Sequence, residues 1–269
     1  MLPMTRANVA PVSSARYALT LARFVLLEAR RSGLLLIVLA TMGAGIGLAA
    51  FMSEVAITEG ANLQIAFLAS FFRIVTVLLT AAFVITSVVR EASDKGNELL
   101  LSLPISRTTY YLGKLLGFSA CGAVVAIAFA VFLLIWSAPA SVAAWGLSLI
   151  LESSLIAGVS LFFVMALGQV VTALAGVTAM YALGRALAAI QSISASPLSG
   201  EESVLHTLAR GGVDLVALLL PSLDKVTQSA WLLYAPPPLA DYLNVLGMLT
   251  VYLALVIAAG LFDFHRRNL

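Results

Sequence analysis

Charged residues are scarce in this chain of 269 residues. Lys, Arg, Asp and Glu together account for 10% of it, whereas 61% of the residues are hydrophobic. A soluble domain is usually about 25% charged, so this chain lacks the polar side chains needed to cover a water-facing surface. The composition therefore excludes a soluble globular domain and predicts an integral membrane protein.

Residues that bind metals, form disulfides or hold nucleotides are few as well. The one cysteine, Cys121, lies inside an apolar run, which excludes a disulfide framework. The two histidines, His206 and His265, belong to no Cys/His cluster with metal-ligand spacing, so we expect no metal site. A Gly-x-x-x-x-Gly-Lys-[Ser/Thr] phosphate loop is also missing. We therefore expect that the chain is not itself an ATPase and binds no cofactor.

Apolar runs of about 20 residues have the length that a helix needs to cross a bilayer. Six spans are predicted, at residues 33–53, 63–89, 110–136, 142–166, 169–190 and 243–262. Pro139 separates the third span from the fourth, because proline in a helix interior removes a donor and clashes with the preceding turn. A weaker break at "LGQVVT" separates the fourth from the fifth. The predicted fold is a single all-α transmembrane domain over residues 1–269.

Two regions outside the spans also have a predicted structure. In residues 14–31, arginines recur at seven-residue spacing opposite an apolar face, a pattern typical of a helix in the membrane interface. That helix could serve only as an anchor or could also touch a partner. The outer segment, residues 191–241, contains the run "VALLLP", which is too short to span. We expect a re-entrant hairpin there, because irregular backbone at membrane depth must be shielded.

The positions of Lys and Arg near the span ends predict the orientation. Basic residues gather before the first span, between the second and third spans, and after the last span. With six spans these three regions share one side, which the positive-inside rule makes cytoplasmic. The opposite side is mainly acidic, with Glu54, Glu59, Glu201, Glu202, Asp214, Asp224 and Asp241. We expect both termini in the cytoplasm.

The connection "REASDKGNELLLSLPISRTTYYLGK", Arg90 to Lys114, concentrates charge that the rest of the chain avoids. Helix formers dominate residues 91–103, Pro104 ends that predicted helix, and Ser106 can cap the third span. A mixed acidic and apolar surface between two spans suits docking to a soluble partner, and the alternative is an ordinary solvated loop. The expected docking residues are Glu91, Asp94, Lys95, Glu98, Leu99, Leu100, Leu101, Pro104 and Arg107.

The same connection resembles the cytoplasmic coupling segment of ABC transporter permeases of the type-2 exporter class. That pattern is an acidic residue, Gly-x-Glu, Leu-Leu-Ser-x-Pro-[Ile/Val]-Ser-Arg, and a Gly-Lys at the next span. It is matched by Glu91, Gly96, Glu98, Leu100, Leu101, Ser102, Pro104, Ile105, Ser106, Arg107, Gly113 and Lys114. The stretch "LLLPSLDKVTQSAWLLY" further resembles the subgroup that includes the permease of nitrous-oxide-reductase maturation, a copper-processing system.

The resemblance implies a permease subunit in the bacterial inner membrane, in contact with lipids and not with nucleic acid. It also implies that the connection docks on a separate cytoplasmic ATPase, which holds ATP-Mg, and that two permease copies form the translocation path. The alternative to a transporter is a permease dimer that transmits the force of ATP hydrolysis to a periplasmic protein and transports nothing. An intramembrane protease fits poorly, because "EESVLH" lacks the arginine and neighbouring histidines of the paired-glutamate membrane proteases. No catalytic residues are expected.

Three charged residues lie within the predicted spans. Glu152 falls in the fourth span, Arg73 in the second and Arg185 in the fifth. A carboxylate inside the membrane is either functional or paired, and the two arginines are its expected partners. In the first span, Gly43 and Gly47 form a Gly-x-x-x-Gly pattern that permits close helix approach, either in a homodimer or within one chain.

Overall fold

The computed structural model describes residues 14–55, 60–94, 106–195, 211–217 and 220–266. These residues form helices and connecting turns, with no β-strand among them. The long helices are α1 (Ser14–Arg31), α2 (Leu34–Val55), α3 (Gly60–Ser93), α5 (Arg107–Leu133), α6 (Pro139–Leu167), α7 (Val170–Ala195) and α10 (Leu239–Arg266). Two short elements, η1 (Leu223–Lys225) and α9 (Ala230–Leu233), precede α10.

Six helices are long and apolar enough to cross a membrane, namely α2, α3, α5, α6, α7 and α10. They fall on the six predicted spans, and the chain is therefore an all-helical, multi-pass membrane protein. Both predicted breaks are confirmed as well. Pro139 occupies the first position of α6, where its missing N–H is not needed. Gly168 ends α6 in the left-handed conformation, with φ 67°, and its N–H donates to the Val164 carbonyl.

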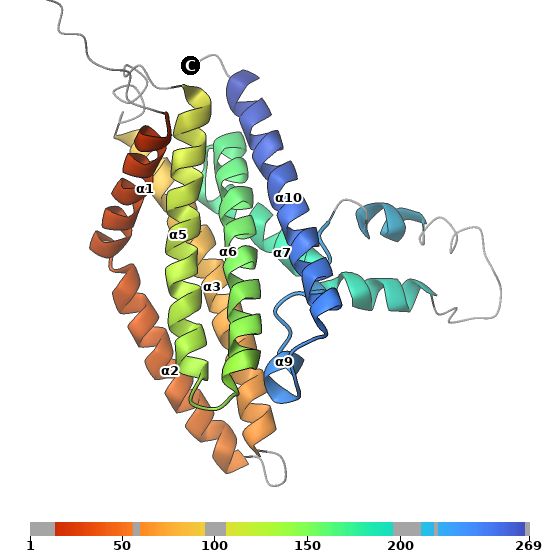
Figure 1. The fold of residues 1–269 in the computed structure, drawn as a ribbon. Helices are drawn as coiled ribbons and strands as arrows, with labels where there is room; N and C mark the ends of the chain where they lie inside the picture. The colour runs from red at the N-terminus through yellow and green to blue at the C-terminus, as the bar shows by residue number, and fades with distance from the viewer. Residues whose placement is uncertain (1–13, 56–59, 95–105, 196–210, 218–219, 267–269) are drawn as a thin grey trace, which may run out of the picture.

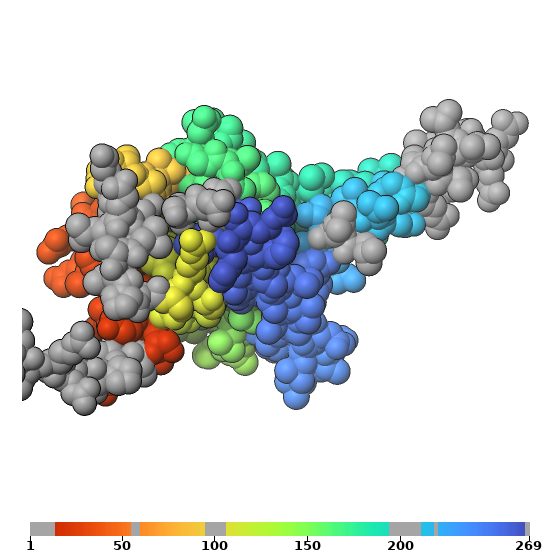
Figure 2. Space-filling model, turned by 90° about the horizontal axis from the view of Figure 1, so that it is seen from above, coloured from red at the N-terminus to blue at the C-terminus, as the bar shows by residue number. Residues whose placement is uncertain are grey.

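The helices form one bundle, with α5 and α6 side by side and α3 behind them (Figure 1). Helices α1 and α2 cover one flank, whereas α10 and α7 lie on the other. Seen along the bundle, α5 lies between α1 and α10 (Figure 2). Phe72 of α3 stacks on Phe129 of α5 with ring centroids 4.5 Å apart, and both side chains are buried. Aromatic packing of this kind holds α3 against α5.

Helix α1 has the predicted bounds, but the apolar face predicted to enter lipid packs in part on α5. The helix runs beside the first half of α5 (Figure 1), and Ala22, Val25 and Ala29 are buried. The two helices approach closely because α5 presents glycines to α1. A Cβ atom on Gly117 would lie only 2.7 Å from Val25 Cβ. Helix α1 is therefore a packed part of the bundle, and its placement at a membrane interface stays a prediction.

Helix α3 continues through Ser93, so no separate helix begins at residue 91. Glu91 belongs to the helix of the second span, where its contacts with α5 stabilise the last turns. Residues 95–105, the rest of the predicted coupling helix, lie outside the described residues. Beyond them Ser106 caps α5 as the sequence predicts, since its Oγ accepts a hydrogen bond from Thr109 N at 3.2 Å.

Helix α7 runs obliquely away from the bundle, and residues 211–217 form a helix near its far end (Figure 1). From Pro221 the chain turns back into the bundle, where Leu223, Val226 and Thr227 are buried. We call residues 221–229 the re-entrant segment. Its irregular backbone lies against α3, α6 and α7, so protein shields it, and its depth in the membrane stays a prediction. Residues 196–210 of the predicted outer segment are not among those described.

Candidate functional site

The buried charge of the bundle centres on Glu152, near the middle of α6. Its side chain is 0% exposed, and Arg185 Nη2 of α7 donates a hydrogen bond to Glu152 Oε1 at 2.9 Å. A lone carboxylate at this depth would carry a large desolvation cost. The charge-assisted bond from Arg185 offsets much of that cost. Of the two arginines predicted as partners, Arg185 forms the ion pair.

The re-entrant segment supplies the second partner of Glu152. Thr227 Oγ1 donates to Glu152 Oε2 at 2.6 Å, and Arg185 Nη1 donates to the Val226 carbonyl at 2.8 Å. Thr227 N also donates to Ser148 Oγ of α6 at 3.1 Å. Thr227 has φ 49°, which β-branched residues rarely adopt, and these bonds hold it in that conformation. Both oxygens of the Glu152 carboxylate therefore have partners inside the chain.

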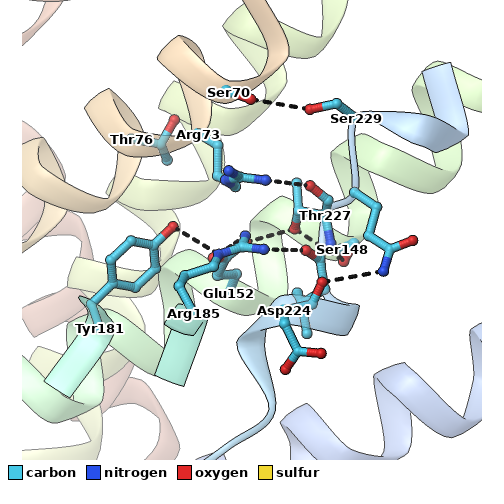
Figure 3. Close-up of polar contacts among 12 residues, drawn as sticks. Ser70, Arg73, Thr76, Ser148, Glu152, Tyr181, Arg185, Asp224, Thr227 and Ser229 are labelled. Atoms are coloured by element: carbon cyan, nitrogen blue, oxygen red, sulfur yellow. Dashed lines mark hydrogen bonds and ion pairs between the residues drawn. The ribbon is translucent and has the colours of Figure 1, made fainter. Parts of the chain in front are cut away.

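Arg73 of α3 approaches the re-entrant segment from another side. Its Nη1 donates to the Thr227 carbonyl at 2.9 Å, whereas its buried Nε has no hydrogen-bond partner among the described residues. The ion pairs of the described part of the chain all involve other groups. Figure 3 shows Arg73 and Arg185 reaching the same stretch of chain from α3 and α7. Arg73 is thus a cation in the bundle with no described carboxylate in contact.

The buried cluster consists of Arg73, Ser148, Glu152, Arg185 and Thr227. It joins α3, α6, α7 and the re-entrant segment through polar contacts inside an apolar bundle. Its three charged members are recognisable in the sequence, because charge inside a span is a strong signal. Ser148 and Thr227 are not, because a serine in an apolar helix and a threonine in a loop carry no pattern that marks them as partners of a carboxylate.

A cavity of about 610 Å³ lies beside the buried cluster, between α3 and α7. It is lined by Arg73, Ile74, Leu78, Thr178, Tyr181, Ala182, Arg185, Asp224, Gln228 and Ser229. One part of this lining is polar and carries both guanidinium groups, and the rest is apolar. The Asp224 carboxylate points away from the two arginines (Figure 3). The polar side of the cavity is therefore cationic.

A second group of charges lies where α3 ends and α5 begins. Arg90 pairs with Glu28 of α1, and Glu91 pairs with Lys114 of α5. The Lys114 side chain is only 3% exposed, so its charge depends on that partner. These four residues form the end clasp, together with Ser87 and Tyr110, which donate hydrogen bonds to the two carboxylates. The clasp ties α1, α3 and α5 together at both ends of the connection 90–114.

Three of the expected docking residues lie in the described part of the chain. Asp94 is exposed and Arg107 is half-buried at the start of α5. Glu91 contacts Lys114 and Tyr110, and its side chain is 17% exposed. Its carboxylate therefore joins α3 to α5 next to the connection 90–114. The other expected residues lie outside the described ranges, namely Lys95, Glu98, Leu99, Leu100, Leu101 and Pro104.

The glycines of α2 divide into two kinds. A Cβ atom on Gly43 or Gly47 would meet no atom within 4 Å, whereas one on Gly45 would lie 2.7 Å from the Phe72 ring. Gly43 and Gly47 therefore face away from the bundle, and the alternative that they serve packing within one chain is wrong for the described residues. Other glycines also allow close packing, among them Gly113 and Gly117 of α5 against α1, a pair that was not predicted to serve packing.

Among the residues that the structure describes, no group of three or more His, Cys, Asp and Glu side chains could hold a metal ion. No protein-family model matches the chain, and a search of curated proteins returns no match. The fold and the site define a class of protein. It is an all-helical membrane protein with six apolar helices, a buried Arg–Glu cluster and a clasped, charged connection between α3 and α5.

Proposed function

We propose that the chain is the membrane-spanning subunit of an ATP-driven ABC transporter of the type-2 exporter class. Its connection 90–114 docks a separate cytoplasmic ATPase, which holds ATP-Mg. The observation that carries this proposal is the charged connection itself, whose sequence resembles the coupling segment of that class and whose two ends are fixed by the end clasp. A chain without a phosphate loop of its own needs such a docking segment to receive energy.

The end clasp supports a mechanical role for the connection. Ion pairs join Arg90 and Glu91 to α1 and α5, so a push on the connection moves three helices together. Helices α3 and α5 are long, with 34 and 27 residues, and extend along the bundle. A movement at one end of either helix therefore reaches its other end. Arg73 lies on α3 and donates to the Thr227 carbonyl, so a shift of that helix alters the buried cluster. ATP binding at the docked subunits would in this way change the cavity between α3 and α7.

A second copy of the chain completes the proposed transporter. The outward face of α2 suits the contact, because Gly43 and Gly47 have open space beside them and allow another helix to approach closely. The copies lie in a bacterial inner membrane, surrounded by lipids, with both termini in the cytoplasm. The alternative is that the dimer transmits force to a periplasmic protein without transport. The cavity beside the buried cluster favours transport, because a pure force transmitter needs no cavity.

Co-purification in detergent tests the docking. The chain is expressed with the ATPase subunit encoded beside it, as wild type and as Glu98→Arg or Leu100→Asp. Both variants should lose the ATPase while the permease stays folded, since one reverses a charge and the other places a carboxylate among the leucines. Glu54→Arg is the matched control, because Glu54 is exposed at the end of α2. Unchanged capture by both docking variants would show that the connection is a solvated loop.

A further inference from the structure

The cavity between α3 and α7 brings together two features that seldom meet in a membrane bundle. Arg73 and Arg185 place two guanidinium groups on its polar side, and Ile74 and Leu78 supply apolar surface next to them. Ile74 is 45% exposed and Leu78 is 42% exposed. Both lie on the spanning helix α3, so the apolar part of the cavity adjoins the exposed apolar surface of that helix.

Arg185 has a counter-charge in contact, whereas Arg73 has none among the described residues. Glu152 pairs with Arg185 and accepts a hydrogen bond from Thr227, and among the described residues no ion pair joins it to Arg73. Asp224 supplies a carboxylate to the cavity lining, but this carboxylate points away from Arg73 and Arg185 (Figure 3). Arg73 is bonded to one backbone carbonyl, and its buried Nε has no partner among the described residues. A cation in this setting is costly unless an anion reaches it.

We propose that this cavity binds an anionic amphiphile, a molecule with a carboxylate or phosphate headgroup and one or more alkyl chains. The headgroup lies against Arg73 and Arg185, whose planar guanidinium groups suit bidentate contact with such oxygens. Gln228 and Ser229 of the re-entrant segment also line the cavity and add polar groups to it. The alkyl chain lies along Ile74 and Leu78 and leaves the cavity between α3 and α7, so the ligand enters from the bilayer.

The shape of the cavity agrees with this ligand. A volume of about 610 Å³ accommodates a headgroup and part of a chain. The re-entrant segment is held by the buried cluster, so the polar wall is fixed before any ligand arrives and little ordering is needed on binding. That the amphiphile is also the cargo of the transporter rests on the proposed function. Binding itself does not, because the whole cavity belongs to a single chain.

Ligand binding is measured on the purified full-length chain alone, in a neutral detergent and without ATPase. The probes are lysophosphatidic acid, a monoacylglycerol with the same alkyl chain, and inorganic phosphate. Binding is followed by native mass spectrometry and by the shift in melting temperature. We expect lysophosphatidic acid to bind and to raise the melting temperature, whereas the neutral lipid and inorganic phosphate have much weaker effects. If the monoacylglycerol binds as tightly as lysophosphatidic acid, the proposed anion contact is wrong. If inorganic phosphate binds as tightly, the proposed role of the alkyl chain is wrong.

Variants locate the bound molecule. Arg73→Gln keeps a polar amide at this position but removes the charge, and should weaken lysophosphatidic acid binding about tenfold. Arg30→Gln is the matched control, because it removes one exposed charge from α1. Leu78→Gln tests the contact with the alkyl chain of the ligand. It leaves the buried cluster intact, so it tests the site even where Arg73→Gln folds poorly. Unchanged affinity in Arg73→Gln and Leu78→Gln would overturn the site.

The two proposals fail separately. Loss of ATPase capture in the docking variants, with no amphiphile binding in the wild type, would keep the transporter assignment and reject this ligand. Amphiphile binding that depends on Arg73, with ATPase capture unchanged in the docking variants, would keep the site and reject the proposed docking.

Discussion

Arg185 Nη2 lies 2.9 Å from Glu152 Oε1, and this contact joins α7 to α6 in the interior of the bundle. The first half of α7 packs in the bundle, where Ala173 and Val177 are buried, and its far end runs away from it (Figure 1). The ion pair fixes the part of α7 that faces the re-entrant segment. The geometry of the cavity depends on this contact, because α7 forms one of its walls.

Removing one member of this ion pair should destabilise the protein more than removing both. Glu152→Leu leaves Arg185 buried without a counter-charge, at an expected cost of about 3 kcal/mol. The double variant Glu152→Leu, Arg185→Leu should recover part of that loss, since no unpaired charge remains. Thermal unfolding in detergent measures both. Glu152→Gln is the milder control, and additive losses in the double variant would contradict the coupling.

The conformation of Thr227 gives a second prediction. Its φ of 49° strains a β-branched residue, by roughly 1 kcal/mol. Thr227→Ala and Thr227→Gly both lose the hydroxyl bonded to Glu152, but only glycine relieves the backbone strain. We expect Thr227→Gly to unfold at the higher temperature of the two. The opposite order would show that the backbone at this position is unstrained.

The two Gly-x-x-x-Gly pairs should respond differently to added methyl groups. Gly117→Ala places a Cβ atom 2.7 Å from Val25 Cβ, and should lower stability by about 1–3 kcal/mol as α1 is pushed from α5. Gly43→Ala meets no atom within 4 Å, and should leave the stability of the isolated chain unchanged. Thermal unfolding of the two variants side by side measures this contrast. Equal losses would mean that α1 does not pack on α5 as described.

The end clasp predicts that Glu91 and Glu98 have separate roles. Glu91→Gln leaves the buried Lys114 without its counter-charge and should lower the melting temperature of the permease alone. Glu98→Arg should leave that temperature unchanged and affect only ATPase capture. Lys114→Met combined with Glu91→Gln is the control, because it removes both charges and should be more stable than Glu91→Gln alone. A Glu91→Gln variant as stable as wild type would contradict the clasp.

The face of α2 can be tested for contact with a second copy. Cys121 is the only cysteine in the sequence. In a Cys121→Ser background, an introduced cysteine is therefore the only thiol that can form a disulfide. Gly47→Cys should form a disulfide-linked dimer in membranes under mild oxidation, whereas Leu255→Cys on the exposed face of α10 should not. Dimers at Leu255 and none at Gly47 would move the contact to another helix.

The composition and the apolar runs were sufficient to predict six helices long and apolar enough to cross a membrane, although most of the observed helices extend beyond the predicted ends. The low charge leaves no other environment for the chain, and residues such as Pro139 and Gly168 act on the backbone locally, so their effect needs no tertiary contact. The amphipathic pattern of α1 likewise predicted a helix with the bounds observed. It could not show that part of the apolar face packs on α5, because lipid and protein favour the same side chains.

Glu152, Arg73 and Arg185 stand out in the sequence because a charge inside a span is rare. The sequence alone determined that they needed partners, and which partner each has was decided by the tertiary structure. Glu152 accepts hydrogen bonds from Arg185 and Thr227, whereas Arg73 donates to the Thr227 backbone carbonyl. The reason is that the re-entrant segment, whose Thr227 lies 75 residues after Glu152, enters between α3, α6 and α7. Its irregular backbone has no periodic pattern from which that position could be read.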